Sequence, residues 1–198
     1  MGLAKRSEEQ RYTWRDYLTW HDDTRWELID GVAYAMAPAP TVRHQDIAGH
    51  IYAQALFCLE GKPCRVLIAP VDVRLPKPSQ DDDRTDTVVQ PDVLAVCDPD
   101  KITERGIRGA PDWVVEVLSP STASHDNILK RRTYEQAGVR EFWLVHPTDR
   151  ILLIYRLENG VYGKPDAQVL EGTTPVLVLP DVTIDWDRIT PVLPPLEL

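Results

Sequence analysis

One acidic residue inside an apolar run constrains the fold of this chain more than any other feature. Glu116 lies within WVVEVL, residues 113–118, where β-branched and aromatic side chains predict a strand buried on both faces. An ionised carboxylate without a partner is expensive to bury, so Glu116 needs a cation, a metal ion or a raised pKa. The run therefore predicts a central strand with a chemically unusual carboxylate on it.

Two further charged residues lie on neighbouring predicted elements. Asp92 precedes the apolar run VLAV, and Lys130 lies on the helix that follows Glu116 in sequence. A divalent ion held by carboxylates can neutralise a phosphate, activate a water and stabilise a leaving oxygen. Magnesium takes few carboxylates and keeps several waters, so Asp92, Glu116 and the backbone carbonyl of Val117 form a suitable partial shell for Mg²⁺ or Mn²⁺. Lys130 would hold the water or a phosphate oxygen, as a charge or as a base with a lowered pKa.

The helix that carries Lys130 is predicted over residues 124–137, beginning with a serine N-cap and stopped by the glycine that follows. One stripe of it has side chains three or four residues apart, at Asp126, Leu129, Lys130, Thr133, Tyr134 and Ala137. Because the apolar members of the stripe should face the sheet, we expect Asp126 and Lys130 to lie near Glu116. Tyr134 is interpreted as a core residue.

Each of these residues also has a purely structural interpretation. Glu116 could form a buried ion pair with Lys130 or Arg140 and take no part in catalysis. Asp92 could be a turn residue that follows a proline. Asp126 could act only on the helix dipole, with Lys130 as its surface partner. The convergence of Asp92 and Lys130 on Glu116 favours the functional interpretation.

Elements elsewhere in the chain predict an α/β (α+β) fold, a mixed sheet flanked by helices. An Asp-Gly pair at 30–31 separates two strand-like runs, which is a strong hairpin signal. A long helix is predicted from Thr41 to Leu59, with inward residues at four-residue spacing. The loop at 76–87 contains three consecutive aspartates and is interpreted as a solvated, mobile segment. The remaining predictions are a helix at 14–20, strands at 65–68, 71–75, 88–96, 141–145, 150–157, 161–162, 176–179 and 182–184, and a charged loop at 98–110.

The length of 198 residues fits one globular domain, residues 1–198, with irregular tails at 1–11 and 191–198. No apolar run approaches the ~20 residues that cross a bilayer, and the N-terminus lacks a signal-peptide core, so a cytoplasmic protein is expected. Cys58, Cys64 and Cys97 match no zinc pattern and are expected to be reduced thiols. The net charge of −9 argues against a broad basic surface for nucleic acid, so phosphate contact should be local, metal-assisted or dependent on a partner.

Six separate segments of the chain form one recognisable combination. They are Pro91-Asp92, GAPDWVVEVLS at 109–119, Asp126 with Lys130 and Tyr134, GVREFWLV at 138–145, ELIDG at 27–31, and APAP at 37–40 with His44. Together they resemble the Uma-two family, a bacterial family of restriction-endonuclease-like proteins. The resemblance extends from about Trp14 to Trp186 and is specific as a combination, whereas any single segment would be weak.

This resemblance implies the PD-(D/E)XK nuclease core, a mixed sheet flanked by helices with metal-binding acids on adjacent strands. Asp92 would be the first acid and Glu116 the second. The family pattern then expects a lysine two residues after Glu116, where this chain has Leu118. The resemblance is to nuclease branches in which the lysine has moved to the neighbouring helix. Here that residue is Lys130, which the helix stripe also selects.

The same resemblance implies two supporting residues. Glu27 would be an additional acid near the site, although it could equally pair with Arg25 or Arg43. His44, at the start of the long helix, would line the cleft or serve only to begin the helix.

These observations predict a metal-dependent endonuclease that hydrolyses DNA, acting as a homodimer by analogy with small nucleases of this fold. A catalytically inactive nuclease-fold protein with a binding or regulatory role is the first alternative, favoured by Leu118 and the acidic charge. A metal-dependent hydrolase of RNA or nucleotides is the second, because an acidic surface suits a small substrate better than long duplex DNA.

Overall fold

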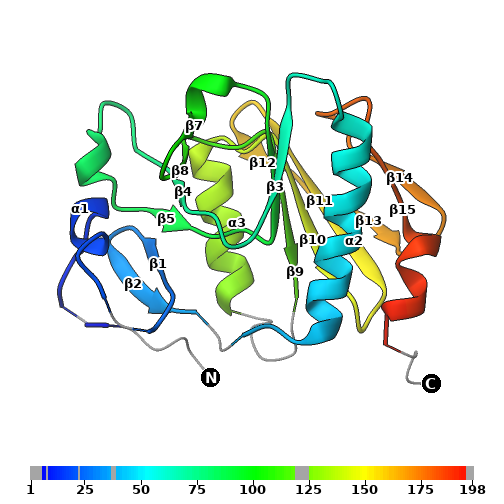
Figure 1. Cartoon of the computed structure of the whole chain (residues 1–198), viewed down its shortest axis with the longest axis horizontal. Coiled ribbons are helices and arrows are strands. Elements are labelled where there is room, and N and C mark those ends of the chain that lie inside the picture. The colour runs from blue at the N-terminus through cyan, green and yellow to red at the C-terminus, as the bar shows by residue number, and fades with distance from the viewer. Residues whose placement is uncertain (1–5, 8, 22, 37–38, 119–124, 195–198) are drawn as a thin grey trace.

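The computed structural model describes residues 6–7, 9–21, 23–36, 39–118 and 125–194, except for the side chains of 125–127. Strand β9 (Trp113–Val117) lies in the interior of the larger, seven-stranded sheet, as its apolar run predicted (Figure 1). The order of this sheet is β12-β11-β10-β9-β6-β3, with β13 paired to β11. Strand β9 is parallel to β10 and antiparallel to β6. The other strands are β3 (Arg65–Ile68), β6 (Val93–Val96), β10 (Glu141–His146), β11 (Ile151–Glu158), β12 (Val161–Tyr162) and β13 (Asp166–Val169).

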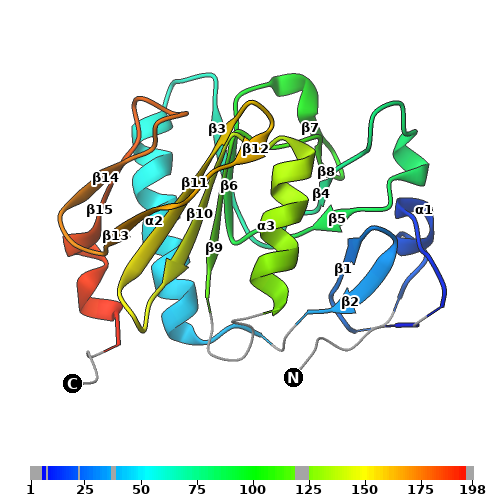
Figure 2. The same cartoon turned by 180° about the vertical axis from the view of Figure 1, so that it is seen from behind.

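One helix covers each face of the large sheet (Figures 1 and 2). Helix α2 (Val42–Leu59) packs Ile47 and Ile51 into one core cluster together with Val115 of β9. Helix α3 (His125–Ala137) packs Tyr134 into a second cluster with Val114. Because side chains alternate along a strand, Glu116 shares the face of Val114 and points towards α3.

A six-stranded sheet lies on the other side of α3, so that this helix is enclosed between two sheets (Figure 2). The cluster around Tyr134 also contains Val73 and Ile107 of this second sheet, which confirms the enclosure. Its order is β2-β1-β5-β4-β8-β7. Its strands are β1 (Trp26–Ile29), β2 (Val32–Ala35), β4 (Val73–Arg74), β5 (Val88–Val89), β7 (Ile102–Thr103) and β8 (Gly106–Arg108).

Two local predictions are confirmed at the residues that motivated them. Asp30 and Gly31 have φ of 50° and 77°, and the β1–β2 hairpin closes on them with Ile29 opposite Val32. Two consecutive residues with positive φ make the turn that suits the twist of a hairpin. Helix α2 begins directly after Thr41, whose hydroxyl accepts a hydrogen bond from the backbone of His44 at 3.2 Å.

The prediction of one strand over residues 88–96 is wrong. Strand β5 belongs to the smaller sheet and β6 to the larger one, and the chain changes sheet between them at residues 90–92. Pro91, which has no amide hydrogen for a ladder, marks the change. This crossing places Asp92 at the start of β6.

The charged segments are more ordered than predicted. Residues 98–110 contain a short helical turn, η2 (Pro99–Lys101), and the β7–β8 hairpin instead of an open loop. In the acidic loop, η1 (Asp82–Arg84) is anchored because buried Arg74 and half-exposed Arg108 both pair with Asp82. The loop is largely exposed, as predicted, and these ion pairs tie it to the smaller sheet.

Both ends of the chain differ in detail from the predictions. Helix α1 ends at Tyr17 instead of residue 20. Near the C-terminus the predicted strand at 182–184 is found at 183–185, where it pairs with a strand at 173–175 instead of the predicted 176–179. Part of the predicted irregular tail forms a helical turn. In the described part of the chain, no helix is both long enough and apolar enough to cross a membrane. The elements in this region are α1 (Trp14–Tyr17), β14 (Thr173–Pro175), β15 (Thr183–Asp185), η3 (Trp186–Arg188) and η4 (Thr190–Val192).

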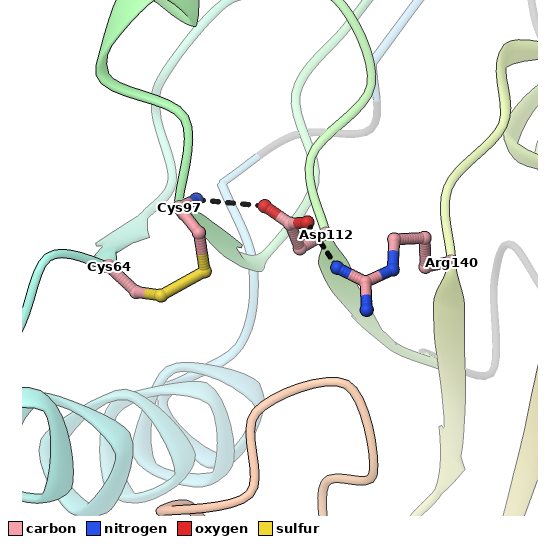
Figure 3. Close-up of a disulfide and its surroundings, with 4 residues drawn as sticks. All are labelled: Cys64, Cys97, Asp112 and Arg140. Atoms are coloured by element: carbon pink, nitrogen blue, oxygen red, sulfur yellow. Dashed lines mark hydrogen bonds and ion pairs between the residues drawn. A yellow bond between two sulfur atoms is a disulfide. The ribbon is translucent and has the colours of Figure 1, made fainter.

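The prediction of three reduced cysteines is also wrong. Cys64 and Cys97 form a disulfide, and Cys58 is free (Figure 3). The reason is the pairing of β3 with β6, in which Arg65 lies opposite Val96, so that the next residues outward are the two cysteines. This disulfide closes the end of β6 that is remote from Asp92.

Figure 3 also shows Asp112 between the disulfide and the neighbouring strand. Its carboxylate accepts a hydrogen bond from the backbone of Cys97 at 2.8 Å and pairs with Arg140 at 2.9 Å. Arg140, one of the two candidate partners of Glu116, is therefore engaged at the opposite end of the sheet.

Candidate active site

Lys130 joins two buried carboxylates that come from different sheets. Its Nζ lies 3.1 Å from Oε1 of Glu27 on β1 and 3.1 Å from Oε1 of Glu116 on β9. The three residues are 4–7% exposed, so the charges interact in a medium of low polarity. The helix stripe predicted this meeting of Lys130 with Glu116, and the enclosure of α3 between the sheets adds Glu27.

Tyr134 is a second donor to Glu116. It lies one turn after Lys130 on α3, is fully buried, and its hydroxyl lies 2.5 Å from Oε1 of Glu116. Burial and the nearby carboxylates raise the pKa of Tyr134 well above 10, so its hydroxyl keeps the proton that it donates. Sequence reasoning assigned Tyr134 to the core alone, although its place on the stripe of Lys130 was the signal for this contact.

The charge state of Glu116 reflects its surroundings. Burial is the main reason that the pKa of this carboxyl is raised from 4.5 to about 8. The charge of Lys130 and the hydrogen bond from Tyr134 oppose this rise, and the charges of Asp92 and Glu27 add to it. Three carboxylates around one lysine leave an excess of negative charge, which a bound cation or proton would relieve.

Glu27 is held by the junction between the two sheets. The backbone N–H of Gln90 donates to Oε1 of Glu27 at 2.7 Å. The side chain of Gln90 in turn donates to Asp72 at 2.8 Å and accepts from Arg25. Arg25, proposed from sequence as a partner of Glu27, thus binds Gln90. Nothing in the sequence pattern identified Gln90 as part of the site.

Asp92 and His44 form the outer edge of the site. Oδ2 of Asp92 accepts a hydrogen bond from the backbone N–H of Val117 at 2.8 Å and lies 3.2 Å from Nε2 of His44. Their side chains are 18% and 11% exposed, which makes this edge more accessible than Glu116. Burial lowers the pKa of His44, but the hydrogen bond and charge of Asp92 and the backbone of Val117 outweigh it, so the net pKa is raised.

The structure thus brings together the predicted residues Glu27, His44, Asp92, Glu116 and Lys130. It also places the backbone of Val117 beside Asp92. The side chain of the remaining candidate, Asp126, lies outside the described residues.

The donor set fits a hard divalent cation. Asp92 and Glu116 offer carboxylate oxygens, and the carbonyl of Val117 belongs to the same strand end. Among residues with described side chains, no three or more His, Cys, Asp or Glu surround one point closely enough to hold a metal ion. Mg²⁺ keeps several waters and takes few protein ligands, so the two carboxylates and one carbonyl would be a sufficient partial shell.

Comparisons with known proteins agree with this fold. The family model Uma2, described as "Putative restriction endonuclease", matches residues 14–187. An uncharacterized protein of Synechocystis sp. (strain ATCC 27184 / PCC 6803 / Kazusa), slr1290, is 30% identical over 151 residues, 73% of this chain and 74% of that protein.

The crystal structure of a putative nuclease belonging to DUF820 from Anabaena variabilis ATCC 29413 shares the fold. Its TM-score is 0.72 at 16% sequence identity, over 92% of this chain and 99% of that one. At this identity the likeness shows the fold alone. The family model, by contrast, spans most of the chain, and the protein belongs to the Uma2 family of putative restriction endonucleases.

Proposed function

We propose that this protein is a metal-dependent endonuclease that hydrolyses DNA phosphodiester bonds. The family and the nuclease-like fold support a nuclease role. The single observation that carries the proposal is the convergence of Asp92, Glu116 and Lys130 at one end of the central strands. Two acids and a lysine are the residues that a metal-dependent phosphodiesterase site of the expected type would use.

Asp92, Glu116 and the carbonyl of Val117 would hold Mg²⁺ or Mn²⁺. When bound, the ion supplies charge neutralisation and lowers the pKa of a water. The residues of the chain have separate tasks. His44 orients Asp92 through the contact at 3.2 Å. Lys130 keeps its ammonium group between Glu27 and Glu116, from where it can turn to a phosphate oxygen.

Duplex DNA is the proposed substrate, and a homodimer is the proposed cutting unit because two strands require two sites. The net charge of −9 limits contact with phosphate to the metal and to single basic side chains. Sedimentation at micromolar concentration tests the assembly, and a mass of one chain at every concentration would contradict it.

The function is tested by incubating the purified protein with plasmid, RNA and nucleotides in Mg²⁺ or Mn²⁺, beside Glu116→Gln and Lys130→Ala. Arg132→Ala, an exposed change on the same helix, is the matched control. We expect wild type and Arg132→Ala to cut plasmid, and the two site variants to lose cleavage. Cleavage of RNA or nucleotides alone would move the proposal to that substrate, and activity that survives Glu116→Gln would overturn the site.

A second candidate is a binding or regulatory protein that keeps the fold without catalysis. The direct contact of Lys130 with Glu116 and the presence of Leu118 where the family pattern expects lysine favour it. It predicts an oligonucleotide complex that forms equally well with EDTA or Mn²⁺ and is never cut. A metal requirement for cleavage would exclude it.

A further inference from the structure

We infer that Tyr134 is a positioning residue, which holds Glu116 with one oxygen turned towards the bound metal. This inference rests on the proposed function and deepens it. Tyr134 is 0% exposed, and its hydroxyl lies 2.5 Å from Oε1 of Glu116. Contacts between a hydroxyl and a carboxylate at this distance are among the strong hydrogen bonds in proteins.

Both donors to Glu116 use the same oxygen. Lys130 approaches Oε1 at 3.1 Å and Tyr134 approaches it at 2.5 Å. Within the described part of the chain, Oε2 receives no hydrogen bond. With Oε1 saturated, Oε2 is the oxygen of Glu116 that remains for a cation.

Lys130 alone cannot keep this orientation during a reaction. It divides its ammonium group between Glu27 and Glu116, and the proposed reaction requires it to turn to a phosphate oxygen. If Lys130 moves away, Tyr134 is the donor in the described part of the chain that still satisfies the buried carboxylate of Glu116.

Tyr134 is suited to stay. Its ring packs against Phe142 with centroids 5.1 Å apart, inside the cluster that joins both sheets to α3. A buried tyrosine has only two side-chain torsions, and dense packing holds it in one rotamer. The longer side chain of Lys130 has more torsions about which it can turn, so the two donors can separate a fixed task from a moving one.

The test compares Tyr134→Phe with Tyr162→Phe. Tyr162 is a matched control because its buried hydroxyl lies in the same core cluster but donates to the Val139 carbonyl, at 2.7 Å, and not to Glu116. Each variant loses one buried hydroxyl and keeps its ring. A role in packing alone predicts that both changes lower stability and that neither changes metal affinity.

The readout is the dissociation constant of Mn²⁺, measured by titration calorimetry on folded full-length protein at one pH. We expect Tyr134→Phe to weaken binding by about 10–100-fold, as loss of a group that orients a metal ligand does. Tyr162→Phe should stay within about twofold of wild type. The cleavage rate of Tyr134→Phe should recover as Mn²⁺ is raised.

Equal Mn²⁺ affinity in wild type and Tyr134→Phe would overturn the inference and leave the proposed function standing. An equal loss in Tyr134→Phe and Tyr162→Phe would also overturn it, because the effect would then be one of packing. A wild-type protein that binds no Mn²⁺ would overturn both the inference and the proposed metal dependence.

Discussion

At the scale of single residues, the site is defined by an imbalance of charge. Glu27, Asp92 and Glu116 share the neighbourhood of Lys130. For Glu116, burial is the largest cause of a pKa raised to about 8. A carboxyl with this pKa is mostly protonated at neutral pH, and binding of a cation would favour loss of its proton. Under the proposed function, a bound cation would be the second positive partner of this acid.

The raised pKa of Glu116 predicts a dependence of stability on pH. Between pH 4.5 and about 8 the folded state binds more protons at Glu116 than the unfolded state does, so the free energy of unfolding falls as pH rises. The slope from this one group is at most about 1.4 kcal/mol per pH unit. Glu116→Gln removes it.

Urea unfolding in EDTA, from pH 5 to 6.5, measures this effect below the usual pKa of histidine. The raised pKa of His44 also lowers stability as pH rises, but mainly above that window. As pH rises from 5 to 6.5, we expect the unfolding free energy of wild type to fall relative to that of Glu116→Gln. A constant difference would mean that Glu116 titrates normally.

Removing the shared cation should be far more damaging than removing a surface cation. Lys130→Met leaves Glu27 and Glu116 buried without their common partner, and we expect a loss of about 3–5 kcal/mol. Arg140→Met breaks a pair whose arginine is 57% exposed, and we expect about 0–1 kcal/mol. Similar losses for the two variants in chemical denaturation would contradict the assigned burial.

At the scale of elements, local signals predicted local structure well. The Asp-Gly turn, the start of α2 after Thr41 and the central place of β9 follow from backbone preferences and periodicity alone. The change of sheet at Pro91 could not be predicted from these local signals, because an apolar run indicates that a strand is buried but not which sheet it joins.

The contacts within the site also divide into those that local spacing predicts and those that depend on how the elements pack. Lys130 could be matched to Glu116 because spacing on one helix fixes a face. Tyr134 lies on the same stripe, but its hydroxyl contact with Glu116 was missed because a buried aromatic residue was interpreted as packing alone. The link from Gln90 to Glu27 depends on the junction of two sheets, which the pattern of either strand alone does not contain.

The disulfide between Cys64 and Cys97 follows from the register of β3 with β6, and we expect it to stabilise the fold. The bond closes a loop between cysteines 33 residues apart. We expect its removal, by reductant or by Cys64→Ser with Cys97→Ser, to lower the free energy of unfolding by about 2–4 kcal/mol.

Urea unfolding with and without reductant measures the change, with Cys58→Ser as the control that leaves the bond intact. Thiol titration of the unreduced, denatured protein should find one free thiol. Three free thiols in protein purified without reductant would contradict the pairing of Cys64 with Cys97.

At the scale of the whole molecule, the fold explains why the site lies where it does. Helix α3 is enclosed between the two sheets, so a single lysine on it can reach an acid from each (Figure 2). Asp92 and His44 complete the site from β6 and α2 at its more accessible edge. No single layer holds the set, which is why the arrangement depends on the complete fold.

Conversion of supercoiled plasmid to nicked and linear DNA, in Mg²⁺ or Mn²⁺, tests the central claim most directly. We expect wild type to cleave, and cleavage to stop in EDTA and in the folded variants Asp92→Asn and Glu116→Gln. Folded wild-type protein that leaves the plasmid intact in both metals would contradict the account, as would cleavage by Glu116→Gln at the wild-type rate.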